Sequence, residues 1–201
     1  MESIYNIYNK SKASIYVTTD KLLENYDYYV GNDQMVNKND PQRIDGKNSY
    51  ISNIITFTLP PTKIDENLYL GTSLNAANYK ELKDYNIKCI INVTKSISNY
   101  YESNENEFNY YRISVEDIKD ESIINNLELT YKYIEKQLEN NNNILIHCFA
   151  GRSRSVALVL FYLIKKHKKS IEESYKSILE KRKVININKS FYNEIKEYFS
   201  N

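Results

Sequence analysis

The chain has 201 residues, which suits one domain with an appendage and leaves little room for two full domains. Its 27 Lys and Arg against 26 Asp and Glu give a formal charge of +1, so no broad positive field attracts polyanions and we expect no nucleic-acid partner. Hydrophobic residues make up 41% of the chain, which is enough for one core. No run approaches the 18 or more apolar residues of a membrane helix, so we expect no integral membrane segment.

The two cysteines, Cys89 and Cys148, are too few for a disulfide framework. No CxxC or HxxxH motif supplies the spacing of metal ligands, and we therefore expect neither a metal site nor a cofactor. The first residues have neither the apolar region of a signal peptide nor the Arg-rich pattern of a transit peptide. These features predict a reducing compartment, the cytoplasm or alternatively the nucleus.

Residues 1–60 show no sustained hydrophobic period, and the polar stretch 31–47 has a loop-like composition, so we expect an N-terminal extension that is partly flexible. Regular alternation begins after it, and we expect 61–201 to form the folded domain. In chain order the pattern predicts strands at 67–70, 88–93, 110–115 and 143–148, and helices at 73–85, 122–139, 153–165, from 170 to about 183, and from 188 to the end.

Several of these helices and strands have strong local signals. The apolar run Ile144–Ile146 is typical of a central strand covered on both faces. Ser170 and Glu173 form a capping box, and Asn188 can cap the last helix. The helix at 122–139 has one apolar stripe, formed by Ile124, Leu127, Tyr131, Ile134 and Leu138. The alternation of strands and helices predicts an α/β fold with a mostly parallel central sheet and helices on both faces.

The junction between the strand at 143–148 and the next helix reads HCFAGRSRS, from His147 to Ser155. A loop that leaves a buried strand and enters a helix turns backbone N–H groups inward and adds the positive end of the helix dipole, which together form a phosphate cradle. Cys148 lies at the floor of this cradle, where the dipoles and the guanidinium of Arg154 lower the thiol pKa and favour a thiolate nucleophile. The planar fork of Arg154 suits two phosphate oxygens, a geometry that a lysine cannot reproduce.

His, Cys, five residues and Arg is the signature of the cysteine-dependent protein tyrosine phosphatase superfamily, and the chain resembles its dual-specificity branch. The resemblance covers about residues 64 to 199 and implies that 61–201 form the catalytic domain. Besides the HCFAGRSRS loop, it is carried by LYLG at 68–71 with Ala76, by Ile87 to Val93, by YRISVED at 111–117, by YLI at 162–164, and by Arg182, Asn188 and Phe191.

The resemblance also implies roles for the loop residues. Cys148 and Arg154 are catalytic, and Ser155 assists breakdown of the phospho-enzyme by a hydrogen bond to the leaving sulfur, although the sequence alone is equally consistent with an ordinary serine in the first turn of a helix. His147 orders the loop and helps to lower the pKa of the cysteine, without transferring protons, and Asn92 matches a position that braces the loop. The phosphate-binding residues are Phe149, Ala150, Gly151, Arg152, Ser153 and Arg154, although Ser153 is equally consistent with a role in loop order alone.

The family's general acid is an aspartate in the loop before the long helix, and Asp117 matches its position. It would protonate the leaving oxygen and then act as base on the water that attacks the cysteinyl-phosphate. Because loops shift by a few residues, Glu116 and Asp120 remain alternatives.

By resemblance, we expect a phosphatase that hydrolyses phosphotyrosine and phosphoserine or phosphothreonine, with a phosphorylated protein as its partner. A phosphoinositide or phosphatidylglycerophosphate phosphatase is the alternative, because Arg152 adds a cation to the loop and a mitochondrial lipid phosphatase branch has AGRSRS there; its partner would be a phospholipid headgroup. An inactive phosphate-binding module is a third reading, disfavoured by the presence of Cys148, Arg154 and Asp117. RNA triphosphatases of the superfamily fit a nearly neutral chain less well.

Two further features have simpler interpretations. Cys89 is placed either to trap an oxidised Cys148 as a disulfide or to fill a small apolar position in its strand, and we favour packing because a resolving cysteine is generally nearer the other end of the strand. The basic run 165–169 is interpreted as cations at a helix C-terminus, where the dipole favours them.

Overall fold

A computed structural model of the chain describes residues 57, 59–103, 107–119 and 121–200. The N-terminal extension expected at 1–60 lies almost wholly outside the described residues, so its boundary and its flexibility stay expectations. Within the described residues, no helix is long and apolar enough to cross a lipid bilayer.

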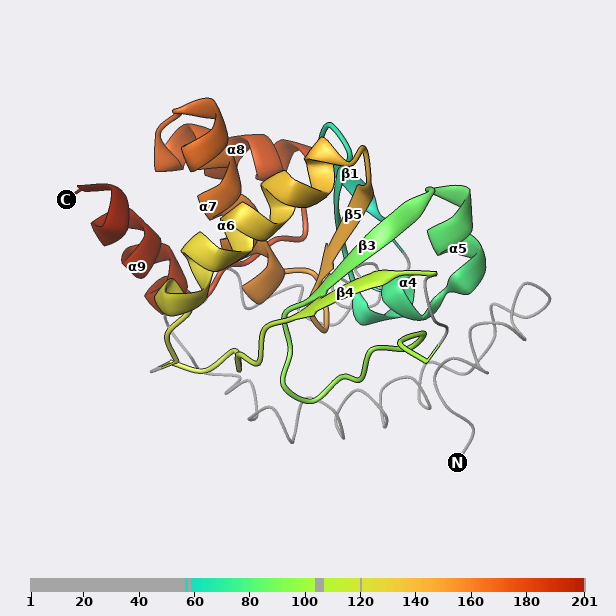
Figure 1. The fold of residues 1–201 in the computed structure, drawn as a ribbon. Helices are drawn as coiled ribbons and strands as arrows, with labels where there is room; N and C mark the ends of the chain where they lie inside the picture. The colour runs from blue at the N-terminus through green and yellow to red at the C-terminus, as the bar shows by residue number, and fades with distance from the viewer. Residues whose placement is uncertain (1–56, 58, 104–106, 120, 201) are drawn as a thin grey trace. The chain divides into compact units, whose positions relative to one another are not determined.

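The described residues form five strands and six helices (Figure 1). The strands are β1 (Thr62–Asp65), β2 (Leu68–Gly71), β3 (Ile87–Asn92), β4 (Asn109–Arg112) and β5 (Asn143–His147). The helices are α4 (Ser73–Ala77), α5 (Tyr79–Asp84), α6 (Ile124–Glu139), α7 (Arg154–His167), α8 (Ile171–Lys181) and α9 (Lys189–Ser200).

The strands form one sheet in the order β1-β2-β5-β3-β4. Strand β1 runs antiparallel to β2, and every other neighbouring pair is parallel. Strand β5 lies at the centre, with Ile146 paired to Leu70 on one side and to Ile91 on the other. The prediction of a mostly parallel sheet is therefore confirmed, and the carboxyl ends of four strands, β2 to β5, meet at one edge. In open α/β sheets that edge is the usual place for a ligand site.

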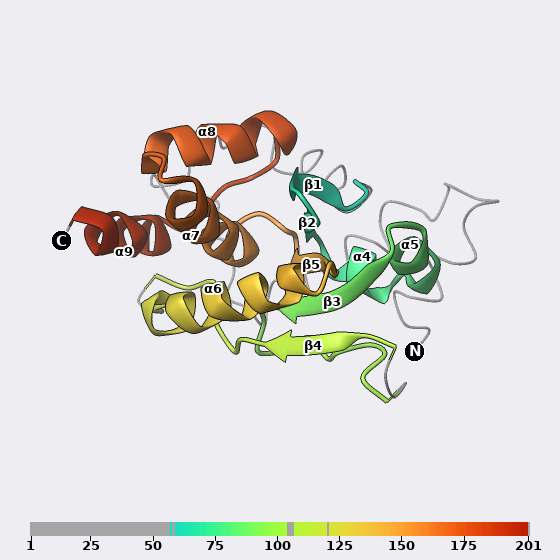
Figure 2. The ribbon, with the colours of Figure 1, turned by 45° about the horizontal axis from the view of Figure 1, so that its top comes forward.

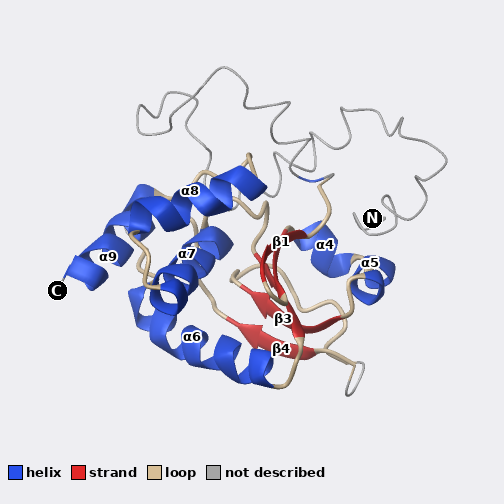
Figure 3. Ribbon diagram, turned by 90° about the horizontal axis from the view of Figure 1, so that it is seen from above, coloured by secondary structure: helices blue, strands red, loops and turns tan. Residues whose placement is uncertain are grey.

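Both faces of the sheet are covered by helices, as predicted (Figures 2 and 3). Successive residues of a strand face opposite sides, so β5 contributes to two apolar clusters. Leu145 packs in one cluster with Leu82 of α5. Ile146 packs in the other with Leu127 of α6 and Phe161 of α7. Helix α7 is buried on every side from Arg154 to Ile164, which explains why this segment is apolar nearly all round.

Two predicted segments differ from the structure. The helix expected at 73–85 is two helices, α4 and α5, because Asn78 interrupts it and its side chain accepts a hydrogen bond from the backbone N–H of Glu81 at 3.2 Å. The strand expected at 110–115 ends at Arg112, because its partner β3 ends at Asn92 and offers no further strand to pair with.

Strand β1 was absent from the sequence prediction. Only one of its four residues, Ile64, is buried, so the segment lacks the alternating pattern that marks a strand. It joins β2 through a turn in which Asn67 has a φ of 58°, a left-handed conformation that asparagine tolerates well. By contrast, the capping box of α8 is present as predicted, with Ser170 Oγ accepting from the N–H of Glu173 at 3.2 Å.

Candidate active site

The loop between β5 and α7, residues 148–153, lies at the carboxyl edge of the sheet. Its backbone carbonyl groups accept hydrogen bonds from the surrounding elements. Phe149 O accepts from the N–H of Ser73 at 3.0 Å, and Arg152 O accepts from the N–H of Asn186 at 2.9 Å. These carbonyl groups point outward, toward donors that surround the loop. The inner side of the loop is therefore left to backbone N–H groups, which can bind an anion.

Two glycines allow close packing where the loop meets β2. Gly151 has a φ of 62°, and a Cβ placed on it would lie 2.4 Å from the carbonyl oxygen of Gly71. A Cβ on Gly71 would lie 2.8 Å from Leu145 Cδ1 and 2.9 Å from Asn75 Oδ1. A side chain at position 151 would force the loop away from β2, and one at position 71 would displace Leu145 of β5 or Asn75 of α4.

Cys148 is the first residue of the loop and is 2% exposed. Burial alone raises the pKa of its thiol, but the charge of Arg154 and hydrogen bonds from the hydroxyl and the backbone of Ser155 outweigh burial and hold the pKa below its ordinary value. The Ser155 hydroxyl donates to Cys148 Sγ at 3.2 Å. The arrangement therefore favours a thiolate.

Arg154 is the first residue of α7 and is 4% exposed. Its Nη1 donates to the carbonyl oxygen of Val115 at 3.2 Å. This bond joins the phosphate loop to the segment after β4, so the guanidinium lies between the two.

Asp117 lies in the segment after β4 and is bound directly to the phosphate loop. Its Oδ1 accepts from the Ser153 hydroxyl at 2.8 Å and from Asn188 Nδ2 at 3.3 Å. Asn188 also donates through Nδ2 to Ile118 O at 3.0 Å, and through its backbone N–H to the Ser153 hydroxyl oxygen at 3.0 Å. The carboxylate is thus fixed beside the loop by two different segments of the chain.

The alternative carboxylates differ in their placement. Glu116 forms an ion pair with Lys95 at 3.2 Å, and both side chains are partly exposed. Asp120 lies outside the described residues. Of Glu116 and Asp117, the two described alternatives, Asp117 is the one bound to the phosphate loop.

His147 and Asn92 occupy the strands behind the loop. His147 is 1% exposed, and burial lowers its pKa to about 4, so it is neutral near pH 7. It is not among the groups that lower the pKa of Cys148, which differs from the expectation that it helps to lower that pKa. Its Nδ1 lies 3.2 Å from Cys148 O, and because a carbonyl only accepts, Nδ1 is the protonated nitrogen. Asn92 binds Ile97 O at 2.8 Å and so orders the loop after β3; its role in bracing the phosphate loop stays a prediction.

The family to which the chain belongs follows from comparison with known proteins. The model described as "Dual specificity phosphatase, catalytic domain" matches residues 68–201, which include the whole phosphate loop, Asp117 and Asn188. The chain belongs to the dual-specificity phosphatase family. This confirms the resemblance inferred from the HC-x5-R motif.

Relatives in the dual-specificity phosphatase family come from distant organisms. Protein phosphatase Slingshot of Drosophila melanogaster is 31% identical over 138 residues, which are 69% of this chain but 13% of that protein. Dual specificity protein phosphatase 1 of Arabidopsis thaliana is 30% identical over 137 residues, which are 68% of each chain. The matched region thus spans only a small part of some relatives and about two thirds of others.

Solved structures share the dual-specificity phosphatase fold. Human DUSP28 has a TM-score of 0.65 at 22% identity, with 70% of this chain and 93% of that chain covered. PTPMT1 in complex with PI(5)P has a TM-score of 0.62 at 24% identity, with 71% of this chain and 96% of that chain covered.

Arg182 carries part of the resemblance to dual-specificity phosphatases, and its side chain binds the back of the phosphate loop. It follows α8, is 1% exposed, and its Nε donates to the carbonyl oxygen of Gly151 at 3.1 Å. Its Nη1 donates to Thr62 Oγ1 at 2.9 Å. Burial lowers the pKa of Arg182 to about 10, so it remains charged near pH 7 and adds a second buried cation behind the loop.

The remaining side chains of the loop lie nearer its rim. Phe149, Ala150 and Arg152 are half-buried. The ring of Phe57, from the segment before β1, meets the ring of Phe149 edge to face at a centroid distance of 5.1 Å. This pair of rings forms an apolar contact at the border of the loop.

The second cysteine has an environment unlike that of Cys148. Cys89 is fully buried, its Sγ lies 3.6 Å from the hydroxyl of Tyr133, and burial raises the pKa of its thiol to about 12. Such a thiol is a poor nucleophile near neutral pH. These properties support the packing role predicted for Cys89. Within the described residues, no group of three His, Cys, Asp or Glu side chains is arranged to hold a metal ion.

Proposed function

We propose that this chain hydrolyses phosphotyrosine and phosphoserine or phosphothreonine in proteins through a cysteinyl-phosphate formed on Cys148. The observation that carries the proposal is the convergence of a thiol with a lowered pKa, a buried Arg154 and a loop-bound Asp117 at one edge of the sheet. Residues 61–201 are the catalytic domain in this proposal. A thiolate nucleophile needs a reducing compartment, which favours the cytoplasm or the nucleus.

In the first step the Cys148 thiolate attacks phosphorus, and the bond from phosphorus to the substrate oxygen breaks. Arg154 and the loop N–H groups bind the non-bridging oxygens, whose charge they stabilise as the transition state forms. Asp117 gives its proton to the departing oxygen, so a neutral alcohol or phenol leaves. The bonds from Ser153 and Asn188 keep the carboxyl group beside the loop for this transfer.

In the second step a water molecule attacks the phosphorus of the cysteinyl-phosphate. The Asp117 carboxylate takes a proton from this water, and the bond from phosphorus to sulfur breaks. The sulfur leaves as a thiolate, which the Ser155 hydroxyl stabilises through the hydrogen bond already present at 3.2 Å. Inorganic phosphate is released and the starting state is restored.

Protein substrates are favoured because the relatives at about 30% identity are named as protein phosphatases. Phospholipid headgroups are the second candidate substrate class. They are supported by the half-buried cation Arg152 in the loop and by the similarity in fold to a structure that contains PI(5)P.

A substrate panel tests this choice. Phosphotyrosine and phosphothreonine peptides are compared with phosphoinositide and phosphatidylglycerophosphate vesicles, and Cys148→Ser is the inactive control. We expect kcat/KM to be higher on the peptides. Peptide rates about a hundredfold below the vesicle rates, with selective loss of vesicle hydrolysis in Arg152→Ala, would reverse the assignment.

A further inference from the structure

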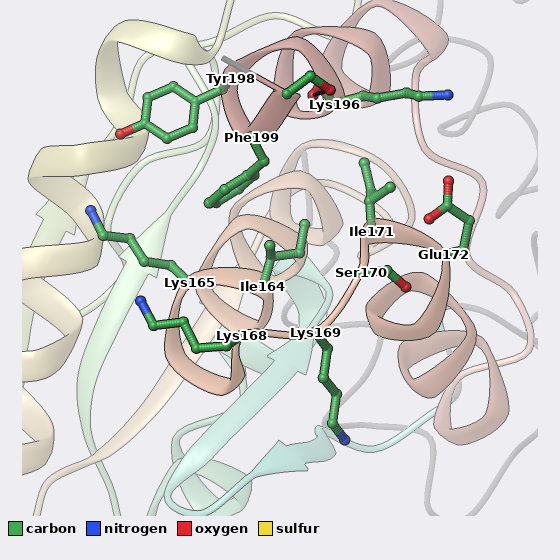
Figure 4. Close-up of a pocket in the computed structure, with 11 residues that line it drawn as sticks. Ile164, Lys165, Lys168, Lys169, Ser170, Ile171, Glu172, Lys196, Tyr198 and Phe199 are labelled. Atoms are coloured by element: carbon green, nitrogen blue, oxygen red, sulfur yellow. Dashed lines mark hydrogen bonds between the residues drawn. The ribbon is translucent and has the colours of Figure 1, made fainter.

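A hollow of about 550 Å³ lies between the C-terminal end of α7, the start of α8 and the last turns of α9 (Figure 4). Helix α7 separates it from the phosphate loop. Because α7 has 14 residues and rises about 1.5 Å per residue, the hollow lies roughly 20 Å from Arg154. It therefore lies outside the site described above.

The centre of the hollow is apolar. Figure 4 shows Ile164, Ile171 and Phe199 turned toward one space, each from a different helix. Phe199 and its neighbour Tyr198 are 39% and 38% exposed, and both rings lie against Phe161 at centroid distances of 5.1 Å. Ile164 and Ile171 are 5% and 9% exposed, so Phe199 and Tyr198 supply most of the accessible apolar surface. A volume of about 550 Å³ exceeds that of a single side chain and suits a short peptide segment that carries one large apolar side chain.

The rim of the hollow is basic. Four lysines line it, against one acidic residue, Glu172. Lys165 is bound to Glu128 by an ion pair and is not available to a partner. In the part of the chain that the structure describes, Lys168, Lys169 and Lys196 make no ion pair and no side-chain hydrogen bond, and all three are exposed. The surface therefore combines an apolar centre with three cations that form no ion pair, although the charge of Lys169 also acts on Glu173, which binds Ser170 at the edge of the hollow.

We propose that this hollow is a docking site for an acidic peptide segment of a protein partner, with one large apolar side chain in the centre and flanking carboxylates at Lys168, Lys169 and Lys196. The lysines on the rim are complementary to an acidic segment, and the apolar centre is complementary to a large apolar side chain of that segment. A membrane fits less well, since the partly exposed rings of Tyr198 and Phe199 are held against Phe161 and the Tyr198 hydroxyl donates to Glu128.

Docking at the hollow would affect catalysis because of its distance from the phosphate loop. This inference rests on the proposed function. An extended chain covers about 3.3 Å per residue, so roughly six or more residues separate the phosphorylated residue from the docked segment. A substrate that carries both would be held at a high local concentration, and its KM would fall without a change in kcat.

Direct binding tests the docking site independently of catalysis. The probe is a fluorescein-labelled, unphosphorylated peptide of Asp and Glu with one central Phe, added to the full chain and followed by fluorescence anisotropy. We expect saturable binding that Lys168→Glu with Lys196→Glu weakens about tenfold or more, since two contacts become repulsive. The matched control, Lys136→Glu with Lys176→Glu, reverses two exposed lysines on α6 and α8 outside the hollow, and we expect a change within about twofold.

The apolar centre has its own control. Replacement of the peptide's Phe by Ser should weaken binding about tenfold, as should Phe199→Ala, and unchanged thermal unfolding shows that the latter variant is folded. Absence of binding to the wild-type chain, equal losses in the two double variants, or equal affinity for the peptide without Phe would each overturn the proposal. Preferential binding to phosphatidylserine vesicles that is lost in the Lys168→Glu, Lys196→Glu variant would assign the surface to a membrane instead.

Hydrolysis assays on the same variants separate this proposal from the proposed function. An aryl phosphate should be hydrolysed equally by the wild-type chain and both double variants. A phosphopeptide with the acidic segment attached should have a KM about tenfold below that of the phosphopeptide alone, and Lys168→Glu with Lys196→Glu should abolish the difference. If neither the wild-type chain nor the variants hydrolyse the aryl phosphate, the proposed function fails. The binding result then still decides whether the docking site exists.

Discussion

The hydrogen bond from Ser155 to Cys148 gives a direct test of how the nucleophile is activated. Burial raises the pKa of the Cys148 thiol, and the charge of Arg154 and the bonds from Ser155 lower it further than burial raises it. In Ser155→Ala the hydroxyl donor at 3.2 Å is lost while Arg154 and the backbone bond remain. The pKa should therefore rise toward the ordinary value of a cysteine.

The size of the rise follows from the type of bond. A hydrogen bond to a charged group contributes about 1.5–3 kcal/mol, and 1.36 kcal/mol corresponds to one pKa unit. Ser155→Ala should therefore raise the pKa by about one to two units. Below the wild-type pKa the thiolate fraction should fall about tenfold or more, and above the variant's pKa the two proteins should have equal thiolate content.

Ultraviolet absorbance of the thiolate, followed between about pH 4 and pH 9, measures this shift. Cys89 does not interfere because its pKa is raised to about 12, and Cys148→Ala supplies the baseline. The same variant should accumulate phospho-enzyme, since the sulfur leaves less easily. An unchanged titration midpoint in Ser155→Ala would refute the role assigned to this hydroxyl.

Three further predictions concern the contacts around the loop. Asp117→Asn should slow hydrolysis of phosphothreonine peptides about 10² to 10⁴-fold and hydrolysis of aryl phosphates far less. Asn188→Ala should show the same preference with a smaller loss of rate. Equal losses on both substrates would reject Asp117 as the acid. Gly151→Ala should lower the free energy of unfolding in urea by about 1–3 kcal/mol or more, because the φ of Gly151 is 62° and the added Cβ would lie 2.4 Å from Gly71 O. A variant as stable as the wild type would contradict the packing described. Arg182→Gln should lower the same free energy by about 1.5–3 kcal/mol through loss of the charged donor to Gly151 O, and an unchanged urea midpoint would show that this bond is dispensable.

Much of the fold was predictable because its central elements have strong local patterns. The run at 144–146 and the apolar helix after it are buried on all sides, and the structure places them as β5 and α7. Strand β1 was missed because one buried residue in four gives no period. The division of the helix at 73–85 depends on a single side-chain cap at Asn78, which an asparagine-rich sequence does not distinguish from its neighbours.

In the candidate site, too, features that depend on neighbouring residues could be predicted, and contacts between residues far apart in the sequence could not. The HC-x5-R motif is local, so Cys148 and Arg154 could be identified from their spacing and from the strand and helix on either side. The bonds among Asp117, Ser153 and Asn188 join residues 35 to 71 positions apart and depend on tertiary packing. Arg182 contacts Gly151 from 31 positions away for the same reason. The catalytic roles of all these residues stay predictions.

The central claim is that Cys148 forms a covalent bond to phosphorus during turnover. Rapid acid quench of the full chain with a phosphotyrosine peptide, followed by mass spectrometry of its proteolytic fragments, measures this directly. We expect one phosphate on the fragment that contains Cys148, more of it in Ser155→Ala, and none in Cys148→Ser. Turnover of the peptide by Cys148→Ser within tenfold of the wild-type rate, with no phosphocysteine in either protein, would contradict the account.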